Sequence, residues 1–332
     1  IMLPTTVAII ATTNHPVTSL AIESVLRHRK DEKIALIING QSGVNTWPQD
    51  WTKEIALKYK IPIHVIAEYG VAHAYNKAIE ISGDDDLVIM QNDVIVTPNW
   101  LEPLQKLAYT HEDIGMVAPF TFPQWPMNHK PFDSSFMNYL KTMAEQYWNV
   151  RPRLFQQEPT KELLEQILKN LFSNLDRFAE MFVEIYKDTL PYDDASMMCM
   201  YFKRDAINRI GKWDEWFYPW NGEDYDYRVR MNNAGLFRLT CFQSFIFHWT
   251  SITTRQQIDE NSEIFKAGLA EGGKIMQKWT KGEVGGYCPV PTQEPKRRYN
   301  KYKLVLHSIG SFVCFVLLDR INTIQHGSVS TI

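Results

Sequence analysis

A short acidic and aromatic segment near residue 220 carries the side chains best suited to acid–base chemistry. Trp220–Arg228 contains three carboxylates within four residues, Glu223, Asp224 and Asp226, and a helical pattern begins behind them. Carboxylates crowded in this way raise one another's pKa, which suits one of them to accept a proton near neutral pH. Acidic residues also favour the first turn of a helix, where they complement the helix dipole. The segment is therefore interpreted both as a helix start and as a candidate general base.

Asp93 and His248 are candidate metal ligands, and each follows an apolar run typical of a buried strand. Asp93 comes after Leu87–Met90, and His248 ends the run Phe245–Phe247. A hard divalent cation prefers oxygen ligands and commonly binds through one or two carboxylates together with substrate phosphates. The alternatives are a turn or helix cap for Asp93 and a structural role for His248, and residue type alone leaves them open.

The first third of the chain alternates short apolar runs with helical patterns, which indicates β-α-β units around a mostly parallel sheet. We expect strands at Thr6–Ala11, Lys33–Ile38, Pro62–Ala67 and Asp86–Met90. Helical spacing covers Thr18–Arg29, Asp50–Tyr59 and Ala72–Ile81. Open α/β sheets bind their ligands at the carboxyl ends of the strands. The candidates for nucleotide binding at that edge are Thr12, Thr13, Asn39, Gln91 and Asn92.

The middle of the chain departs from this alternation. After a candidate strand at Met116–Pro119, a proline- and aromatic-rich loop leads into a long helical stretch, so we expect a helical insert at about residues 134–190. An insert of this kind over an α/β core usually forms a lid or a wall beside the binding site. Further strands are expected at Ala195–Lys203 and Arg238–Phe247.

Composition is that of an ordinary globular protein. The 332 residues are 45% hydrophobic and 13% aromatic, enough for one large core or two modest ones. A net charge of −3 provides no basic field, which disfavours duplex nucleic acid as a bulk partner. Four widely spaced cysteines indicate neither a disulfide framework nor a structural zinc, and favour a reducing, cytoplasmic setting. The sequence contains no GxxxxGK(S/T) or GxGxxG loop, which disfavours P-loop enzymes and Rossmann dehydrogenases.

The C-terminal part is expected to lie outside the main domain, which we place at residues 1–281. Residues 282–295 are rich in glycine and proline, as in a linker. A basic run follows, and then the apolar stretch Leu304–Leu318, which is short of the roughly 20 residues needed to span a bilayer. Residues 282–332 are interpreted as a basic and apolar extension, used for packing in the core or a homo-oligomer, or for peripheral contact with a membrane surface.

Taken in order, these segments resemble the family 2 glycosyltransferases, which have the Rossmann-like GT-A (nucleotide-diphosphosugar transferase) fold. Glu68–Ala78 is similar to the family's N-x-G-x-A-x-A-x-N-x-G helix start, and this adds Asn76 to the nucleotide-sugar candidates. Gln91-Asn92-Asp93 occupies the place of the DxD metal motif. Gly222–Arg228 resembles the ED-x-D-x-x-R segment that carries the catalytic base, and His248 falls where several members have a further metal ligand.

The resemblance covers about residues 6–254, interrupted by the insert, and implies the transfer of one sugar from a nucleotide-diphosphosugar. It implies that Asp224 takes the proton from an attacking acceptor hydroxyl, with Glu223 in support. A single displacement of this kind inverts the anomeric centre. Asp226 and Trp220 are expected to orient or contact the acceptor, because an indole face suits a sugar ring.

The same resemblance implies a divalent cation, Mn²⁺ or Mg²⁺, held by Asp93 and His248. Two positions depart from the family pattern. Gln91 stands where the first carboxylate of DxD is usual, and Asn39 stands where the family usually has an aspartate that pairs with uracil. An asparagine can donate and accept hydrogen bonds, so it still suits a pyrimidine edge. UDP is the favoured carrier, ahead of dTDP and GDP.

The acceptor stays open among a glycan, a lipid carrier, a protein and a modified nucleobase. Two other functions are compatible with the fold, a sugar-phosphate nucleotidyltransferase and a catalytically inactive sugar- or nucleotide-binding scaffold. Nucleotidyltransferases usually have a glycine-rich basic loop after the first strand, which Ala11–Pro16 does not resemble. The neutral Gln91 favours a decayed metal site and hence an inactive scaffold. The joint retention of Asp93, Glu223, Asp224 and His248 argues against it.

Overall fold

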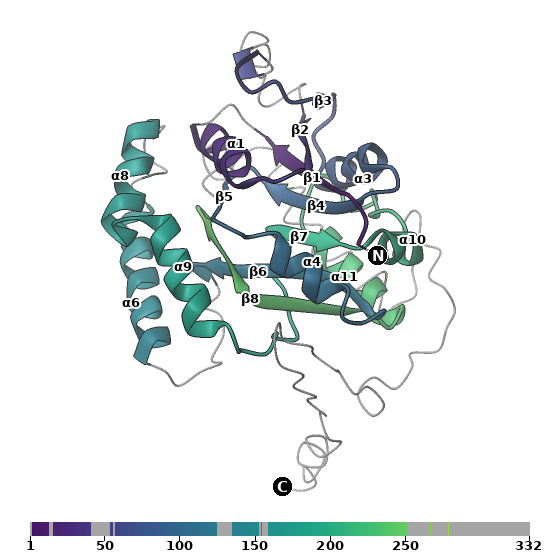
Figure 1. Cartoon of the computed structure of the whole chain (residues 1–332). Helices are drawn as coiled ribbons and strands as arrows, with labels where there is room; N and C mark the ends of the chain where they lie inside the picture. Colours follow the sequence, from purple (N-terminus) through teal and green to yellow (C-terminus); the bar gives the residue numbers. More distant parts are fainter. Residues whose placement is uncertain are drawn as a thin grey trace, which may run out of the picture.

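A mixed eight-stranded sheet forms the centre of the protein and has helices on both faces (Figure 1). The strands follow one another in the order β3-β2-β1-β4-β7-β6-β8-β5. The computed structural model describes residues 2–12, 16–40, 54–55, 57–124, 135–152, 154, 159–250, 266 and 278.

The first four strands of the order are parallel, as the sequence predicted. They are β1 (Thr5–Ala11), β2 (Lys33–Asn39), β3 (Ile63–Ile66) and β4 (Asp86–Gln91). All seven residues of β1 are buried, because helices cover both faces of this half of the sheet. The expected strand boundaries agree with these to within one residue at each end.

The other half of the sheet mixes directions. It consists of β5 (Val94–Val96), β6 (Ile114–Phe122), β7 (Cys199–Phe202) and β8 (Phe237–His248). β7 lies antiparallel between β4 and β6, β8 runs parallel to β6, and β5 pairs antiparallel with β8 at the edge. Because β6 and β8 run in the same direction as the first four strands, the expectation of a mostly parallel sheet is confirmed, and β7 and β5 are the two antiparallel strands.

Two sets of helices cover the two faces. α1 (Pro16–His28) and α4 (Glu102–Ala108) contribute apolar side chains to the core on one face. On the other face the core includes side chains of α3 (Val71–Ser82), α10 (Arg204–Ile210) and α11 (Glu223–Asn233). Residues 54–55 and 57–59 are helical, and the rest of the helix expected at Asp50–Tyr59 lies outside the described residues.

In the described part of the helical insert, three helices stand side by side at one end of the sheet (Figure 1). They are α6 (Ser135–Val150), α8 (Lys161–Phe172) and α9 (Leu175–Tyr186). Thr160 and Asn174 cap α8 and α9 by accepting hydrogen bonds from Leu163 N (3.2 Å) and Arg177 N (3.0 Å). The insert shares a separate buried core with β6 and β8 that is rich in aromatic residues, and it is therefore a packed wall of the domain.

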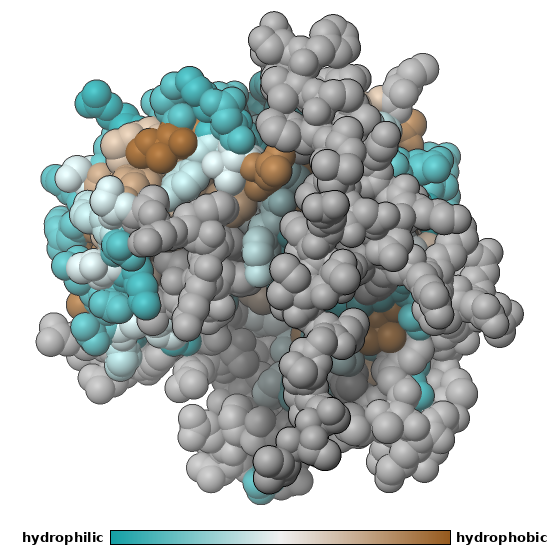
Figure 2. All heavy atoms as spheres, turned by 90° about the horizontal axis from the view of Figure 1, so that it is seen from below, coloured by the Kyte–Doolittle hydropathy of each residue, from teal (hydrophilic) through white to brown (hydrophobic). Residues whose placement is uncertain are grey.

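The described surface on the face in Figure 2 is largely hydrophilic, with hydrophobic residues in small separate spots. Across the described residues, no helix combines the length and apolar character needed to cross a membrane. The linker and extension expected at residues 282–332 lie outside the described residues.

Candidate functional site

Asp93 and His248 are brought together at the edge of the sheet by the pairing of β5 with β8. Val94 lies opposite His248 in this antiparallel pair, and Trp249 N donates a hydrogen bond to Asp93 O at 2.9 Å. His248 Nε2 consequently lies 3.0 Å from Asp93 Oδ1, and both side chains are only 3% exposed. Two residues separated by nearly half of the chain thus form one buried pair.

The hydrogen bonding of His248 determines what this pair can bind. His248 Nδ1 lies 2.8 Å from Gln124 Oε1, and an amide oxygen accepts, so we assign the ring proton to Nδ1. Nε2 then directs its lone pair toward Asp93 Oδ1. Neither of these two buried atoms has a hydrogen-bond partner among the described residues. Two acceptors this close require a cation or a proton between them, so the donor set fits a divalent metal ion.

A metal ion bound to this pair would need further ligands from outside the pair. Among the described residues, no group of three or more His, Cys, Asp or Glu side chains could hold a metal ion. Mg²⁺ commonly binds through one or two carboxylates and completes its coordination with substrate phosphates and water. Gln124 orients the histidine from behind, as groups next to metal ligands usually do.

Asp224 lies in the first turn of α11. The chain enters this helix through Asn221 and Gly222, both with positive φ, and the value of 122° at Gly222 is one that favours glycine. Burial raises the pKa of Asp224 to about 7, and the positive charge of Arg228 one turn later opposes that rise. Asp224 Oδ1 has no hydrogen-bond partner in the described part of the chain. Such a carboxylate can accept a proton near neutral pH.

A pocket of about 450 Å³ joins these two features. Asp224 and Arg228 line it from α11. Gln124, which contacts His248, lines it from the side where Asp93 and His248 lie. Arg228 is held in place by hydrogen bonds to Asp194 and to Ala195 O, which also line the pocket. Its other lining residues are Thr121, Ser196, Met197, Met198 and Thr240. The pocket is therefore lined both by Asp224, a candidate proton acceptor, and by Gln124, which contacts the candidate metal ligand His248.

Four of the candidates for nucleotide binding are described at or near the carboxyl edge of the sheet. Asn39 Oδ1 accepts from Gly70 N at 3.0 Å, and its Nδ2 has no partner among the described residues. Gln91 Nε2 donates to Tyr75 Oη at 3.2 Å. Thr12 follows β1 and is partly exposed, whereas Thr13 lies outside the described residues. Asn92, the fourth, is buried.

Asn92 and Asn76 hold structural elements together. Asn92 Nδ2 donates to Thr18 Oγ1 at 2.7 Å, which fastens the end of β4 to α1. Asn76 Nδ2 donates to Trp213 O at 3.0 Å, and Trp213 N donates back to Asn76 Oδ1 at 2.8 Å. Both asparagine side chains are buried and hydrogen-bonded to protein partners, so each holds neighbouring elements in place, and their contact with a nucleotide-sugar stays a prediction.

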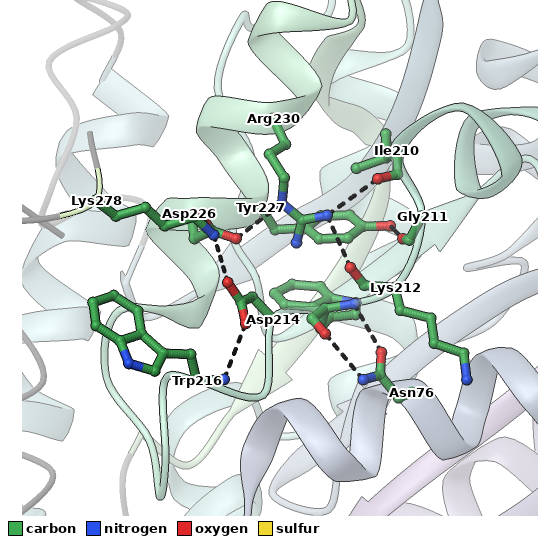
Figure 3. A network of polar contacts seen from close by, with 11 residues as sticks. Asn76, Ile210, Gly211, Lys212, Asp214, Trp216, Asp226, Tyr227, Arg230 and Lys278 are labelled. Atoms are coloured by element: carbon green, nitrogen blue, oxygen red, sulfur yellow. Dashed lines mark hydrogen bonds and ion pairs between the residues drawn. The ribbon is translucent and has the colours of Figure 1, made fainter. Parts of the chain in front are cut away.

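Asp226 does not face the pocket with a free oxygen, in contrast to its expected contact with an acceptor. Its side chain is fully buried, with Oδ2 2.9 Å from Arg230 Nε and Oδ1 2.7 Å from Lys278 Nζ (Figure 3). Trp220 is partly buried and directly follows Pro219, whose carbonyl accepts from Val71 N at 3.0 Å. Glu223 is buried beside Asp224 in the first turn of α11.

Sequence patterns did not single out Gln124, Asp194 or Lys278. Gln124 directly follows Pro123 in a proline- and aromatic-rich segment, and Lys278 precedes the linker expected at residues 282–295; neither residue lies in a motif. Their contacts join segments far apart in the chain, so no local spacing could have indicated them. Arg228 belonged to a noted motif, but its contact with residues 194 and 195 required the tertiary structure.

Comparisons with known proteins place the chain among sugar transferases. The sequence model of glycosyl transferase family 2 matches residues 7–179, more than half of the chain. A search of curated proteins gives no match. Among solved structures, GalNAc-T7 with UDP, GalNAc and Mn²⁺ is 14% identical at a TM-score of 0.52, over 84% of this chain and 48% of that chain. This chain thus spans about half the length of GalNAc-T7, and the likeness shows a shared fold.

A second similar structure is the mannosyltransferase PcManGT from Pyrobaculum calidifontis in complex with GDP-Man and Mn²⁺. It is 11% identical at a TM-score of 0.47, over 87% of this chain and 66% of that chain.

Proposed function

Because the chain belongs to glycosyl transferase family 2, we propose that it transfers a sugar from a nucleotide-diphosphosugar to an acceptor hydroxyl, with inversion of the anomeric centre. The observation that carries the proposal is the single pocket that Asp224 lines from one side and Gln124, the partner of His248, lines from another. The pocket would therefore contain a proton acceptor and lie next to a cation site.

Asp93 and His248 would hold the metal ion, Mn²⁺ or Mg²⁺. Their buried, mutually facing acceptor atoms support this assignment, since a metal ion between them satisfies both atoms. When bound, a divalent cation neutralises the diphosphate and stabilises it as a leaving group. The neutral Gln91 adds no charge to this site and holds Tyr75 instead.

Asp224 would act as the general base. The acceptor oxygen forms a bond to the anomeric carbon while the bond from that carbon to the diphosphate oxygen breaks. The electron pair of the broken bond leaves with the diphosphate, and the hydroxyl proton passes to Asp224. A pKa of about 7 suits this transfer, because a large share of the carboxylate is ionised at neutral pH and it is still basic enough to take the proton.

UDP is the favoured nucleotide, ahead of dTDP and GDP. Asn39 supports this choice, because its Nδ2, which has no partner among the described residues, offers a donor to a carbonyl of the base. Thr12, Thr13 and Gln91 remain proposed contacts of the nucleotide-sugar. GalNAc-T7 was crystallised with UDP and Mn²⁺, which agrees with the nucleotide and with the metal ion proposed for this chain.

The acceptor would enter the pocket near the first turn of α11, where Trp220 offers an aromatic face. Glycans, lipid carriers, proteins and modified nucleobases all carry suitable hydroxyl groups. Residues 282–332 would serve a homo-oligomer contact or peripheral attachment of a cytoplasmic enzyme to a membrane surface, because a basic run there precedes an apolar stretch.

The proposed function can be tested by a screen of nucleotide-sugars for slow hydrolysis without an acceptor, with and without Mn²⁺. We expect release of UDP from one UDP-sugar, dependent on the metal and lost in Asp93→Ala. Turnover of a nucleoside triphosphate with a sugar phosphate would indicate a nucleotidyltransferase. Binding of the donor with no turnover, even when acceptor candidates are supplied, would indicate an inactive scaffold.

A further inference from the structure

A buried network of four charged side chains lies behind the first turn of α11. Lys278 Nζ lies 2.6 Å from Asp214 Oδ2 and 2.7 Å from Asp226 Oδ1, and Arg230 Nε lies 2.9 Å from Asp226 Oδ2 (Figure 3). None of these four side chains is more than 4% exposed. Lysine and aspartate are almost never this buried unless they are paired, so each depends on the others.

The charges balance only when Lys278 is counted. Arg230 reaches Asp226 and also donates to the carbonyl oxygens of Ile210 and Lys212, at 3.1 Å and 2.8 Å. Arg230 therefore compensates Asp226 and supports the chain after α10, while Asp214 faces Lys278. Two buried carboxylates are matched by two cations, and loss of Lys278 would leave one buried negative charge in excess.

The two carboxylates that Lys278 bridges belong to two different segments. Asp226 lies in the first turn of α11, and Asp214 lies in the loop between α10 and α11. That loop is also fixed by stacking of Trp213 on Tyr227, with ring centroids 4.0 Å apart, and by the bonds from Trp213 to Asn76. Lys278 thus cross-links the loop to the helix turn from a position far beyond the last strand.

We propose that Lys278 is a positioning residue for sugar transfer, which holds the first turn of α11 so that Asp224 stays against the pocket. Asp224 lies two residues before Asp226, so any shift of the turn that follows loss of the cross-link moves both carboxylates. This proposal rests on the proposed function. It also extends the catalytic unit to residue 278, beyond the family match that ends at residue 179.

The test compares three variants of the full chain. Lys278→Met removes the cross-link, and Lys212→Met is the matched control, because Lys212 lies on the same loop with an exposed side chain and contributes only its carbonyl oxygen to Arg230. The double variant Lys278→Met with Asp214→Asn removes one charge of each sign and restores the balance. For each variant we would measure kcat and KM for transfer, binding of UDP with Mn²⁺, and hydrogen exchange of residues 213–226.

For Lys278→Met we expect kcat to fall by about 10²-fold, the usual effect of displacing a catalytic group by about 1 Å. Binding of UDP with Mn²⁺ should stay unchanged, and exchange of residues 213–226 should accelerate. The double variant should keep the lowered kcat, because it restores the charge balance without the cross-link. Lys212→Met should match the wild type in every measurement. These results together support the positioning role.

Normal kcat and normal exchange in Lys278→Met would overturn the proposal. Loss of UDP binding together with kcat would also overturn it, because that pattern indicates general damage to the fold. Recovery of kcat in the double variant would overturn it too, because the excess buried charge, and not the missing cross-link, would then explain the loss. Sugar transfer by Asp224→Asn distinguishes failure of the proposed function from failure of this proposal. If Asp224→Asn transfers sugar normally, the base is wrongly assigned, while hydrogen exchange still reports whether Lys278 holds the turn.

Discussion

At the scale of single residues, the chemistry centres on Asp224, where two opposing influences act on one carboxyl. Burial disfavours the charged form, and the guanidinium of Arg228 favours it. Burial is the larger effect, so the pKa rises to about 7. Arg228 is itself anchored to Asp194 and the carbonyl of Ala195, which fixes the distance over which its charge acts. Such a group is uncommon in a structural position and typical of a functional one.

Replacement of Asp224 by asparagine tests this assignment with little change in shape. The amide cannot take a proton, so kcat should fall by about 10²–10⁴-fold. Binding of the donor should change little, because the diphosphate is proposed to bind at Asp93 and His248. In the wild type, kcat should rise with pH through about pH 7 and level off above it, since only the ionised carboxylate acts as base. Steady-state kinetics between pH 5 and pH 9 (a range that brackets the shifted pKa) measures both effects.

Arg228→Gln provides the companion measurement. Removal of the positive charge should move the acidic limb of the profile to higher pH, because that charge lowers the pKa of Asp224. Near-normal transfer by Asp224→Asn, together with an inactive Glu223→Gln, would move the base to its neighbour. A product that keeps the anomeric configuration of the donor would contradict the single displacement.

At the scale of elements, the short strand β5 brings the two candidate metal ligands together. Its antiparallel pairing with β8 aligns Val94 with His248 and brings Asp93 against the imidazole. Gln124, just after β6, completes the arrangement by binding the other ring nitrogen. Three strand ends therefore meet at the proposed cation site, and each contributes one side chain.

The metal assignment predicts a graded series of binding defects. Asp93→Ala should abolish the tightening of UDP binding by Mn²⁺, because it removes the charged ligand. His248→Ala should weaken that coupling less, since the carboxylate and diphosphate remain. Gln124→Ala should lower Mn²⁺ affinity by about 10–100-fold, the usual effect of losing a residue that orients a metal ligand. Calorimetric titration of UDP at several Mn²⁺ concentrations measures all three.

Gln166→Ala is the matched control for that series. Gln166 lies exposed on α8 and donates only to Asn170, one turn along the same helix. Its replacement should leave the coupling between UDP and Mn²⁺ unchanged. If Mn²⁺ still tightens UDP binding fully in Asp93→Ala, the cation site lies elsewhere.

At the scale of the whole molecule, the helical insert supports the site from outside. Tyr147 Oη donates to Trp249 O at 2.6 Å, and Arg151 Nε donates to Thr250 O at 2.8 Å, so α6 and the turn after it hold the chain directly after His248. The aromatic core of the insert includes Phe245 and Phe247 of β8, and Phe247 directly precedes His248. The insert therefore helps to position Asp93 and His248, the candidate metal ligands.

Tyr147→Phe tests this support by removing a single hydroxyl. The buried carbonyl of Trp249 loses its donor, which should lower the free energy of unfolding by about 1–3 kcal/mol. The coupling of Mn²⁺ to UDP binding should weaken as well, because His248 loses part of its support. Chemical denaturation and the same titration provide the two measurements. Tyr139→Phe is the control, since Tyr139 lies on the same helix and is 51% exposed; equal effects of the two variants would contradict the supporting role.

Much of the fold could be predicted from sequence because it depends on local patterns. The buried runs of β1, β2 and β4 are nearly continuous and β-branched, as strands covered on both faces must be, and their expected ends were correct to within a residue. The family resemblance rests on motifs in a fixed order, and the match over residues 7–179 confirms it. Local patterns could not predict the antiparallel direction of β7 or the strand β5, because pairing direction depends on contacts distant in the chain.

The sequence alone therefore determined the class of fold, the family and the residue types available for chemistry. Only the tertiary structure decided which polar side chains have partners within the protein. Asn76, Asn92 and Asp226 look like ligand contacts in a motif, yet buried hydrogen bonds and ion pairs occupy them. Gln124 and Lys278 belong to no motif, yet they touch His248 and Asp226. The physical reason is that a buried polar group must be satisfied by whatever lies beside it in space, and sequence spacing does not contain that information.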